Sequence, residues 1–119
     1  NMAILFITHD LGVVAQMTDR VFVMYLGEVV ESADVVTLFY EPKHPYTQAL
    51  LRSVPQAGQF EDGQRLKAIH GSVPSPYARP KGCPFHTRCD QAIRGVCDIQ
   101  TPPLVKISDD HYVKCVLYE

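Results

Sequence analysis

The sequence predicts an α/β unit followed by a small, loop-rich, cysteine-containing α+β extension. Two features of composition support this division. All nine prolines lie at or after Pro42, and all four cysteines lie between Cys83 and Cys115. Residues 1–41 carry six acidic residues and one basic residue, whereas residues 42–119 carry seven acidic and ten basic residues. This abrupt change indicates that two different kinds of structure are joined at the boundary.

Composition and charge exclude several classes of protein. The chain of 119 residues is 46% apolar and 20% charged, which is typical of a globular domain with a core. A formal net charge of −2 and a pI near 6.2 provide no basic excess for holding a nucleic-acid backbone. The longest apolar run, residues 21–26, is far shorter than the roughly 20 residues of a membrane-spanning helix. No signal peptide is visible, so we expect a cytosolic protein that does not bind nucleic acid.

The first segment begins with the pattern of a strand, a turn and a helix. Residues 3–8 are mostly apolar and rich in β-formers, which is typical of a strand covered on both faces in a parallel sheet. Asp10 follows in a position to cap a helix whose apolar residues recur at helical spacing from Leu11. We therefore predict a buried central strand over residues 3–8 and a helix directly after it.

A hairpin and a short helix are predicted next. Residues 20–25 and 28–31 are rich in β-formers and flank a Leu-Gly pair suited to a tight turn. Ser32 and Asp34 are alternative caps for the helix that follows, which we expect to stop before Pro42.

The second segment is predicted to lose regular structure as it proceeds. A helix begins near Pro45, because proline costs little in a first turn, and it buries Ala49 and Leu50. The polar residues 56–64 suggest a linker. Beyond them, only residues 91–95 suggest a helical turn and only residues 112–117 suggest a short strand.

The four cysteines have the spacing Cys83-x5-Cys89-x7-Cys97-x17-Cys115. Four thiolates that meet at one point bind soft metals, either zinc or an iron–sulfur cluster. Structural zinc sites usually contain two close pairs, with two to four residues between partners, whereas no pair here is that close. The wider spacing favours a [4Fe-4S] cluster. The alternatives left open are zinc, with His86 as a further candidate ligand, disulfides, and plain buried thiols.

Two stretches of the chain resemble a known family. The first stretch comprises ILFITHDLGVV at residues 4–14 and MYLGEVVE at residues 24–31. It resembles the switch-histidine end of an ABC-transporter nucleotide-binding domain. The second stretch comprises HPYTQALL at residues 44–51 and GCPFH at residues 82–86. It resembles the C-terminal extension found in the ATP-binding subunits of peptide and nickel importers. The phosphate-binding loop, the helical signature and the acidic metal-binding motif of such domains are absent. By this resemblance, the chain is a C-terminal fragment of a longer subunit.

The resemblance implies roles for parts of the chain. Residues 1–41 would be the last strand, helix and hairpin of the nucleotide-binding domain, and residues 42–119 would be the extension. His9 would be catalytic: it would contact the γ-phosphate of ATP and orient the attacking water. Tyr46 is expected to be a packing residue. The proposed metal ligands are Cys83, Cys89, Cys97 and Cys115, whereas ATP and Mg would bind only in the full-length subunit.

The resemblance also implies partners and a location. The partners are transmembrane permease subunits and a second nucleotide-binding subunit, on the cytoplasmic side of the cell membrane. We expect the fragment alone to be inactive and to hide its apolar edge by dimerising or exchanging elements. The competing hypothesis is a self-standing iron–sulfur or zinc-binding module with a structural or redox-sensing role.

Overall fold

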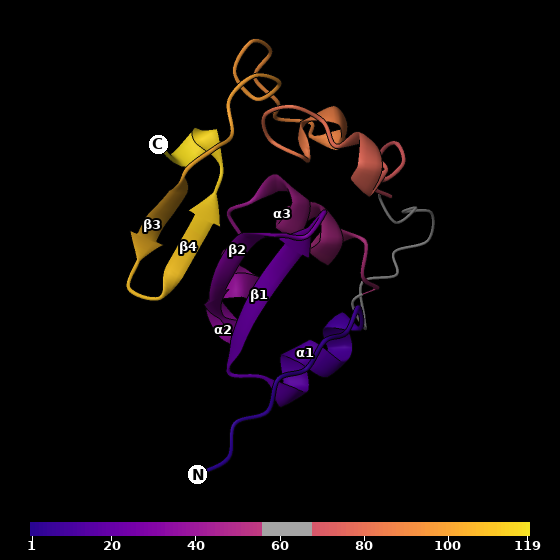
Figure 1. Cartoon of the computed structure of the whole chain (residues 1–119). Coiled ribbons are helices and arrows are strands. Elements are labelled where there is room, and N and C mark those ends of the chain that lie inside the picture. Colours follow the sequence, from indigo (N-terminus) through magenta and orange to yellow (C-terminus); the bar gives the residue numbers. More distant parts are fainter. Residues whose placement is uncertain (56–67) are drawn as a thin grey trace.

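The computed structural model describes residues 1–55 and 68–119 (Figure 1). The helices are α1 (Leu11–Met17), α2 (Val35–Tyr40) and α3 (Pro45–Arg52). The strands are β1 (Arg20–Tyr25), β2 (Glu28–Asp34), β3 (Leu104–Ser108) and β4 (His111–Lys114). Single-turn 3-10 helices are η1 (Pro76–Ala78), η2 (His86–Arg88) and η3 (Val116–Tyr118). The linker predicted for residues 56–64 lies outside the described residues.

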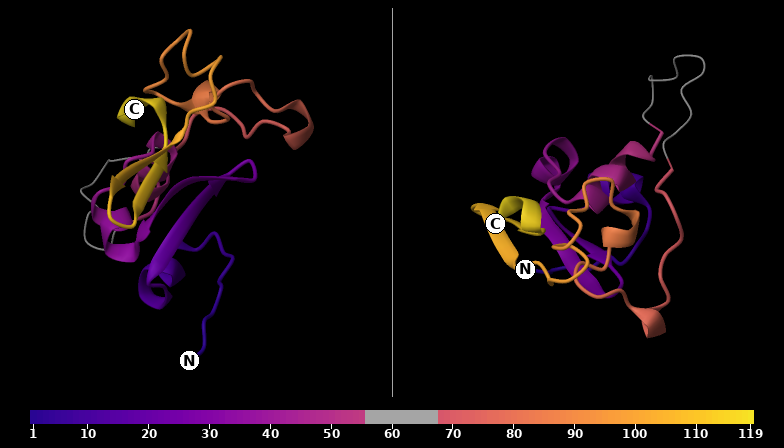
Figure 2. Two further views of the ribbon diagram at one scale, coloured as in Figure 1. Left: turned by 60° about the vertical axis from the view of Figure 1, so that its left-hand side comes forward. Right: turned by 90° about the horizontal axis from the view of Figure 1, so that it is seen from above.

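The four strands form one antiparallel sheet in the order β1-β2-β4-β3. Each half of the chain contributes a hairpin, and the two hairpins join where β2 pairs with β4. At that junction Glu31 lies opposite Val113, and Ser32 lies opposite Tyr112. Figure 2 shows the last hairpin beside the first one, with the loop-rich segment above them. The molecule is therefore a small α/β structure whose sheet contains strands from both sides of the predicted boundary.

The predicted hairpin over residues 20–31 is confirmed. Leu26 and Gly27 both have positive φ, at 47° and 79°, as a tight turn between twisted strands requires. Glycine adopts this conformation at little steric cost. The second arm is longer than predicted, because β2 continues to Asp34.

The predicted helix caps are also confirmed, with one of two alternatives selected. Asp10 Oδ1 accepts hydrogen bonds from Gly12 N at 2.9 Å and from Val13 N at 3.2 Å, at the start of α1. Asp34 Oδ1 accepts from Thr37 N at 3.0 Å and caps α2. Ser32 lies inside β2 instead.

The predicted buried strand at residues 3–8 is wrong. These residues form no strand in the described part of the chain and are exposed, with Leu5 83% and Ile7 93% accessible. A strand covered on both faces needs neighbouring strands that pair with its backbone. None of the four described strands pairs with this segment. It therefore runs as an extended, solvated tail that ends at the N-terminus in Figure 1.

The second segment differs from the prediction in three places. Residues 91–95 form no regular helix, but Cys97 N donates to Ile93 O at 2.9 Å, so the helical turn predicted there is confirmed in part. The strand predicted at residues 112–117 is confirmed in part, because β4 ends at Lys114 and a 3-10 turn follows. Strand β3 was not predicted, since the prolines before it obscure its pattern.

The core joins the hairpin to the extension. Its buried members include Val30, Leu38 and Phe85, each 1% accessible. The helix predicted near Pro45 is confirmed as α3, although Pro45 and Thr47 are its buried residues, while Ala49 and Leu50 are only half-buried. The extension therefore packs on the same core as the first hairpin.

Candidate metal centre

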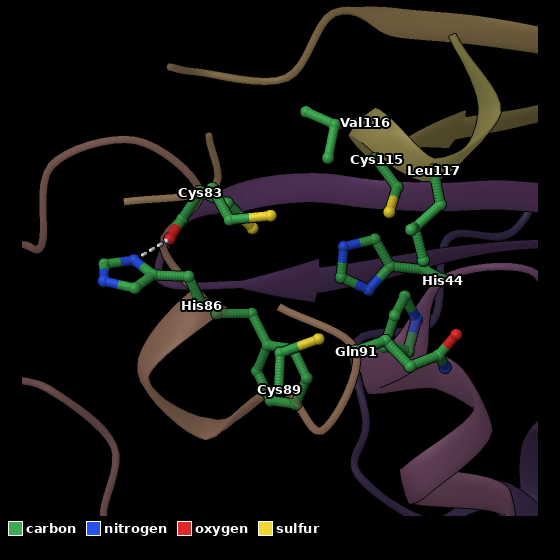
Figure 3. Close-up of a pocket in the computed structure, with 11 residues that line it drawn as sticks. His44, Cys83, His86, Cys89, Gln91, Cys115, Val116 and Leu117 are labelled. Atoms are coloured by element: carbon green, nitrogen blue, oxygen red, sulfur yellow. Dashed lines mark hydrogen bonds between the residues drawn. The ribbon is translucent and has the colours of Figure 1, made fainter. Parts of the chain in front are cut away.

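The four cysteines line a single pocket, although they are far apart in the sequence. Figure 3 shows Cys83, Cys89 and Cys115 around this pocket, together with His44, His86 and Gln91. The remaining lining residues are Pro45, Phe85, Cys97, Val116 and Leu117. The pocket thus lies where the start of α3, the loops at residues 83–97 and the end of the chain meet.

Hydrogen bonds between loops place the cysteines. Cys83 N donates to Cys97 O at 2.8 Å and so joins two loops directly. Ile93 N donates to Cys97 Sγ at 3.3 Å, which fixes that side chain. Cys115 follows β4 directly, so the β2–β4 pairing brings it to the pocket.

A glycine makes the approach of the two loops possible. Gly82 has φ +74°, and a Cβ on it would lie 2.3 Å from Cys97 O, closer than real Cβ atoms come. Only glycine satisfies both the backbone conformation and the close contact. Gly82 therefore determines how near Cys83 lies to Cys97.

The thiols are buried and influence one another. Cys83, Cys97 and Cys115 are 9%, 8% and 7% accessible, and Cys89 is half-buried. Burial raises the pKa of Cys89 to about 11, with further upward contributions from the negative charge on the other three thiols. Burial likewise raises the pKa of Cys83 and of Cys115. At neutral pH the thiols of Cys83, Cys89 and Cys115 are therefore protonated.

Several of the alternatives from the sequence can be compared with this geometry. All four cysteines are free thiols, so the structure contains no disulfide among them. In the part of the chain that is described, no group of three or more His, Cys, Asp or Glu side chains is placed to hold a metal ion. His86 Nδ1 donates to Cys83 O at 2.8 Å, and its ring points away from the pocket in Figure 3. In the described residues the side chains are therefore not arranged to hold a zinc ion or an iron–sulfur cluster, with or without His86.

His44 forms the wall of the pocket at the start of α3. Its Nδ1 accepts a hydrogen bond from Tyr46 N at 3.1 Å and caps the helix. Burial lowers its pKa to about 4, against the opposing charge of Glu31. Tyr46 packs with Tyr25 and Phe85, at ring-centroid distances of 4.8 Å and 5.2 Å, which confirms its predicted packing role. The His-Pro-Tyr sequence thus builds a cap, a helix start and an aromatic contact.

Sequence reasoning missed the buried carboxylate of Glu31, which holds the backbone at His44 in place. Glu31 is 0% accessible, and it accepts from Lys43 N at 2.7 Å and from His44 N at 2.8 Å. His111 Nε2, from β4, donates to the same carboxylate at 2.7 Å. Neither residue is distinguished by its spacing, because charged residues at strand positions are ordinarily expected to face solvent. Glu31 therefore ties β2, α3 and β4 together beneath the pocket.

The predicted catalytic histidine lies elsewhere. His9 is exposed and lies between the extended tail and α1, where the cap at Asp10 begins the helix. Figure 1 and the left view of Figure 2 show this end of the molecule opposite the loop-rich segment that carries three of the cysteines. The structure therefore does not bring His9 and the cysteines together.

Comparison with known proteins finds relatives whose names all refer to peptide transport. The family model described as "Oligopeptide/dipeptide transporter, C-terminal region" matches residues 30–97, more than half of the chain. The oligopeptide transport ATP-binding protein AppD of Bacillus subtilis is 50% identical over 100% of this chain and 35% of its own length. The dipeptide transport ATP-binding protein DppD of Escherichia coli is 44% identical, over 97% of this chain and 34% of its own. The chain thus spans about a third of the length of the relatives it matches.

The match includes the features described above. The matched range contains most of β2, all of α3 and three of the four cysteines. Among the described residues, none of the helices combines the length and apolar character that crossing a membrane requires. The chain belongs to the family of oligopeptide/dipeptide transporter C-terminal regions, found in ATP-binding subunits of ABC importers.

Proposed function

We propose that the chain is part of the ATP-hydrolysing subunit that powers peptide import through an ABC transporter. The observation that carries this proposal is the similarity of the whole chain to peptide transport ATP-binding proteins. Residues 1–41 are the C-terminal part of the nucleotide-binding domain, with the switch-histidine loop. Residues 42–119 are the extension of peptide importers. The match extends across both segments, so a self-standing metal-binding module is not favoured.

The proposed partners follow from this assignment. ATP and Mg bind in the complete subunit, whose phosphate-binding loop is outside this sequence. ATP binding closes two nucleotide-binding subunits against each other and drives the permease subunits between their two states. The subunit works at the cytoplasmic side of the membrane. The isolated 119-residue chain does not hydrolyse ATP and associates through its exposed apolar tail.

His9 is proposed to act on the γ-phosphate. Its exposed side chain is available to a ligand, and the cap at Asp10 orders the backbone beside it. An imidazole hydrogen bond there stabilises the developing charge and orients water. In the complete transporter, His9→Ala should lower ATP turnover on the order of 100-fold while ATP binding is kept. His70→Ala, at another exposed histidine, is the control. Unchanged turnover in the His9 variant would contradict this role.

The cysteine pocket is proposed to hold a [4Fe-4S] cluster. Support comes from the donor set: four free thiols line one pocket, and thiolates are the usual ligands of such clusters. A bound cluster would link the loops that carry its cysteine ligands. It would also supply one-electron redox chemistry. Cys89→Ser should lower the bound iron and sulfide, whereas Thr87→Ser, at an exposed neighbouring position, should not. Iron and sulfide equal to wild type in the Cys89 variant would exclude it as an essential ligand.

A further inference from the structure

The C-terminal hairpin is attached to the rest of the molecule along one strand. Among the described strands, β3 pairs with β4 alone, and β4 pairs with β2 at two residue positions. Residues 100–103, which lead into the hairpin, form neither helix nor strand. Figure 1 shows β3 and β4 as a yellow pair at the side of β2. The hairpin is therefore a small unit with a short line of backbone pairing to the first hairpin.

The inward face of this unit carries a row of buried side chains. His111, Val113 and Cys115 are 2%, 0% and 7% accessible, whereas the residues between them are half-buried. Side chains alternate between the two faces of a strand, so these three lie on one face. One end of the row contacts Glu31, and the other end lies in the cysteine pocket. The hairpin thus connects the buried carboxylate to the thiols.

The contact between His111 and Glu31 is the most deeply buried polar contact of the hairpin. His111 Nε2 donates to Glu31 Oε1 at 2.7 Å. The other side-chain contacts that attach the hairpin are exposed or half-buried: Arg20 with Asp110 at 3.1 Å, Lys114 with Glu28 at 2.8 Å, and Tyr118 OH with Lys43 O at 2.8 Å. Ion pairs near water contribute little, whereas a buried polar group that loses its partner is costly. Attachment therefore depends mainly on the buried contact.

The main core does not depend on the hairpin. Its cluster of buried side chains includes Val30, Ala33, Leu38 and Phe85, and none of its fully buried members belongs to residues 104–119. Parts of a protein with few buried contacts to the core can open while the core stays folded. The hairpin has the structural features of such a part.

Movement of the hairpin would open the cysteine pocket. Cys115, Val116 and Leu117 form one wall of this pocket, and they follow β4 directly. The other three cysteines lie within residues 83–97, ahead of the hairpin. Figure 3 shows Cys115 and Leu117 on the side of the pocket opposite Cys83 and Cys89. Separation of β4 from β2 would therefore remove one thiol from the other three and admit solvent to all four.

We infer that residues 104–119 form a strap that opens and closes over the cysteine pocket as one unit, with the contact between Glu31 and His111 as its latch. The strap controls access to the thiols, and the first hairpin stays folded when it opens. This device needs no bound metal. Its test is therefore independent of the proposed cluster and of the proposed transport function.

Hydrogen–deuterium exchange of the complete natural polypeptide tests the strap. Exchange is read by mass spectrometry at several urea concentrations below the unfolding transition. Amides of β4 should exchange faster than the amides that join β1 to β2, and with a weaker dependence on urea, because local opening exposes less surface than unfolding. Equal rates with equal urea dependence would mean that the strap opens only when the whole fold does, which would overturn the inference.

Substitutions of His111 test the latch. His111→Leu leaves the Glu31 carboxylate without its side-chain donor and should raise the exchange rate of β4 on the order of 30-fold, without changing that of β1. His111→Gln keeps an N–H near the position of Nε2 and should lie closer to wild type. Lys106→Gln is the matched control, because it breaks an exposed ion pair with Asp109 within the same hairpin. Equal acceleration of β1 and β4 in His111→Leu would overturn the latch.

Thiol labelling of the wild-type protein tests whether the strap covers the pocket. The reduced polypeptide is freed of metal with a chelator and treated with N-ethylmaleimide, and each labelled cysteine is identified by mass spectrometry. Cys97 and Cys115 should become accessible with the same opening constant as β4, because one movement uncovers both. Labelling of Cys97 only at urea concentrations that unfold β1 would overturn the inference, even where the His111 variants fail to fold.

Discussion

Two apolar segments of this chain differ in how far they are buried. The tail around Leu5 and Ile7 is exposed, whereas Val30 and Ala33 of β2 are 1% and 0% accessible. Strand β2 has β1 on one side and β4 on the other, but the tail pairs with none of the described strands. An apolar run therefore indicates that a segment must pack against other elements to be buried. Whether such elements are present depends on the rest of the chain.

The largest expected effect is the difference between truncating a side chain of the tail and one of the buried core. Leu38, on α2, is 1% accessible and packs against the core, so Leu38→Ala should lower the free energy of unfolding by about 3 kcal/mol. Leu5→Ala removes the same atoms from a side chain that is 83% exposed, and should change the free energy of unfolding by less than about 0.5 kcal/mol.

Urea unfolding of both variants checks this prediction. Equal losses would mean that the tail packs against the molecule in solution, contrary to the structure.

A smaller effect is expected at the glycine that brings two cysteine loops together. Gly82→Ala places a methyl group against Cys97 O and should destabilise the chain by about 2 kcal/mol. If the proposed cluster is bound, the variant should also contain less iron. Gly95→Ala is the matched control, because Gly95 also has positive φ but no atom lies within 4 Å of its added Cβ. It should cost about 1 kcal/mol. Iron content and urea unfolding of the two variants decide the point, and equal effects would show that loop contact is unimportant.

The smallest effect concerns the ion pairs that Glu28 of the first hairpin makes with other parts of the chain. Glu28 Oε2 lies 2.8 Å from Lys114 Nζ, and the carboxylate also pairs with Arg79. The hydrogen bond from Lys114 is the largest cause that lowers the pKa of Glu28 below its usual 4.5. A carboxyl whose pKa is lowered by folding stabilises the protein above the unfolded pKa and loses that contribution as pH falls.

Glu28→Gln should therefore reduce stability by less than about 1 kcal/mol at pH 7. The difference from wild type should shrink as the pH falls below about 4.5. Unfolding curves at pH 7 and at pH 3 measure it. A difference that stays constant between these pH values would exclude the ion pairs as its source.

Local chemistry made several features of the chain predictable. The turn at Gly27, the caps at Asp10 and Asp34 and the start of α3 at Pro45 depend on residues close in sequence, and each was confirmed. Each of these features needs only a backbone preference or a short side chain.

Long-range partners could not be predicted in the same way. The pairing of β2 with β4 and the buried contact between Glu31 and His111 join residues 80 to 82 positions apart. The spacing of residues near Glu31 in the sequence does not indicate which distant residues will contact it. The cysteine spacing pointed to a shared site, and the structure places all four on one pocket, but the spacing gave no hint that His44 lines it.

Metal analysis of the wild-type protein is the most direct test of whether the cysteine pocket holds a cluster. The complete natural polypeptide is purified without oxygen, and iron, sulfide and zinc are determined on one sample together with its absorption spectrum. About four irons and four sulfides per chain are expected for a cluster held by four thiolates. One zinc per chain would contradict the cluster and make the pocket a structural zinc site, and the absence of all three would leave four buried thiols.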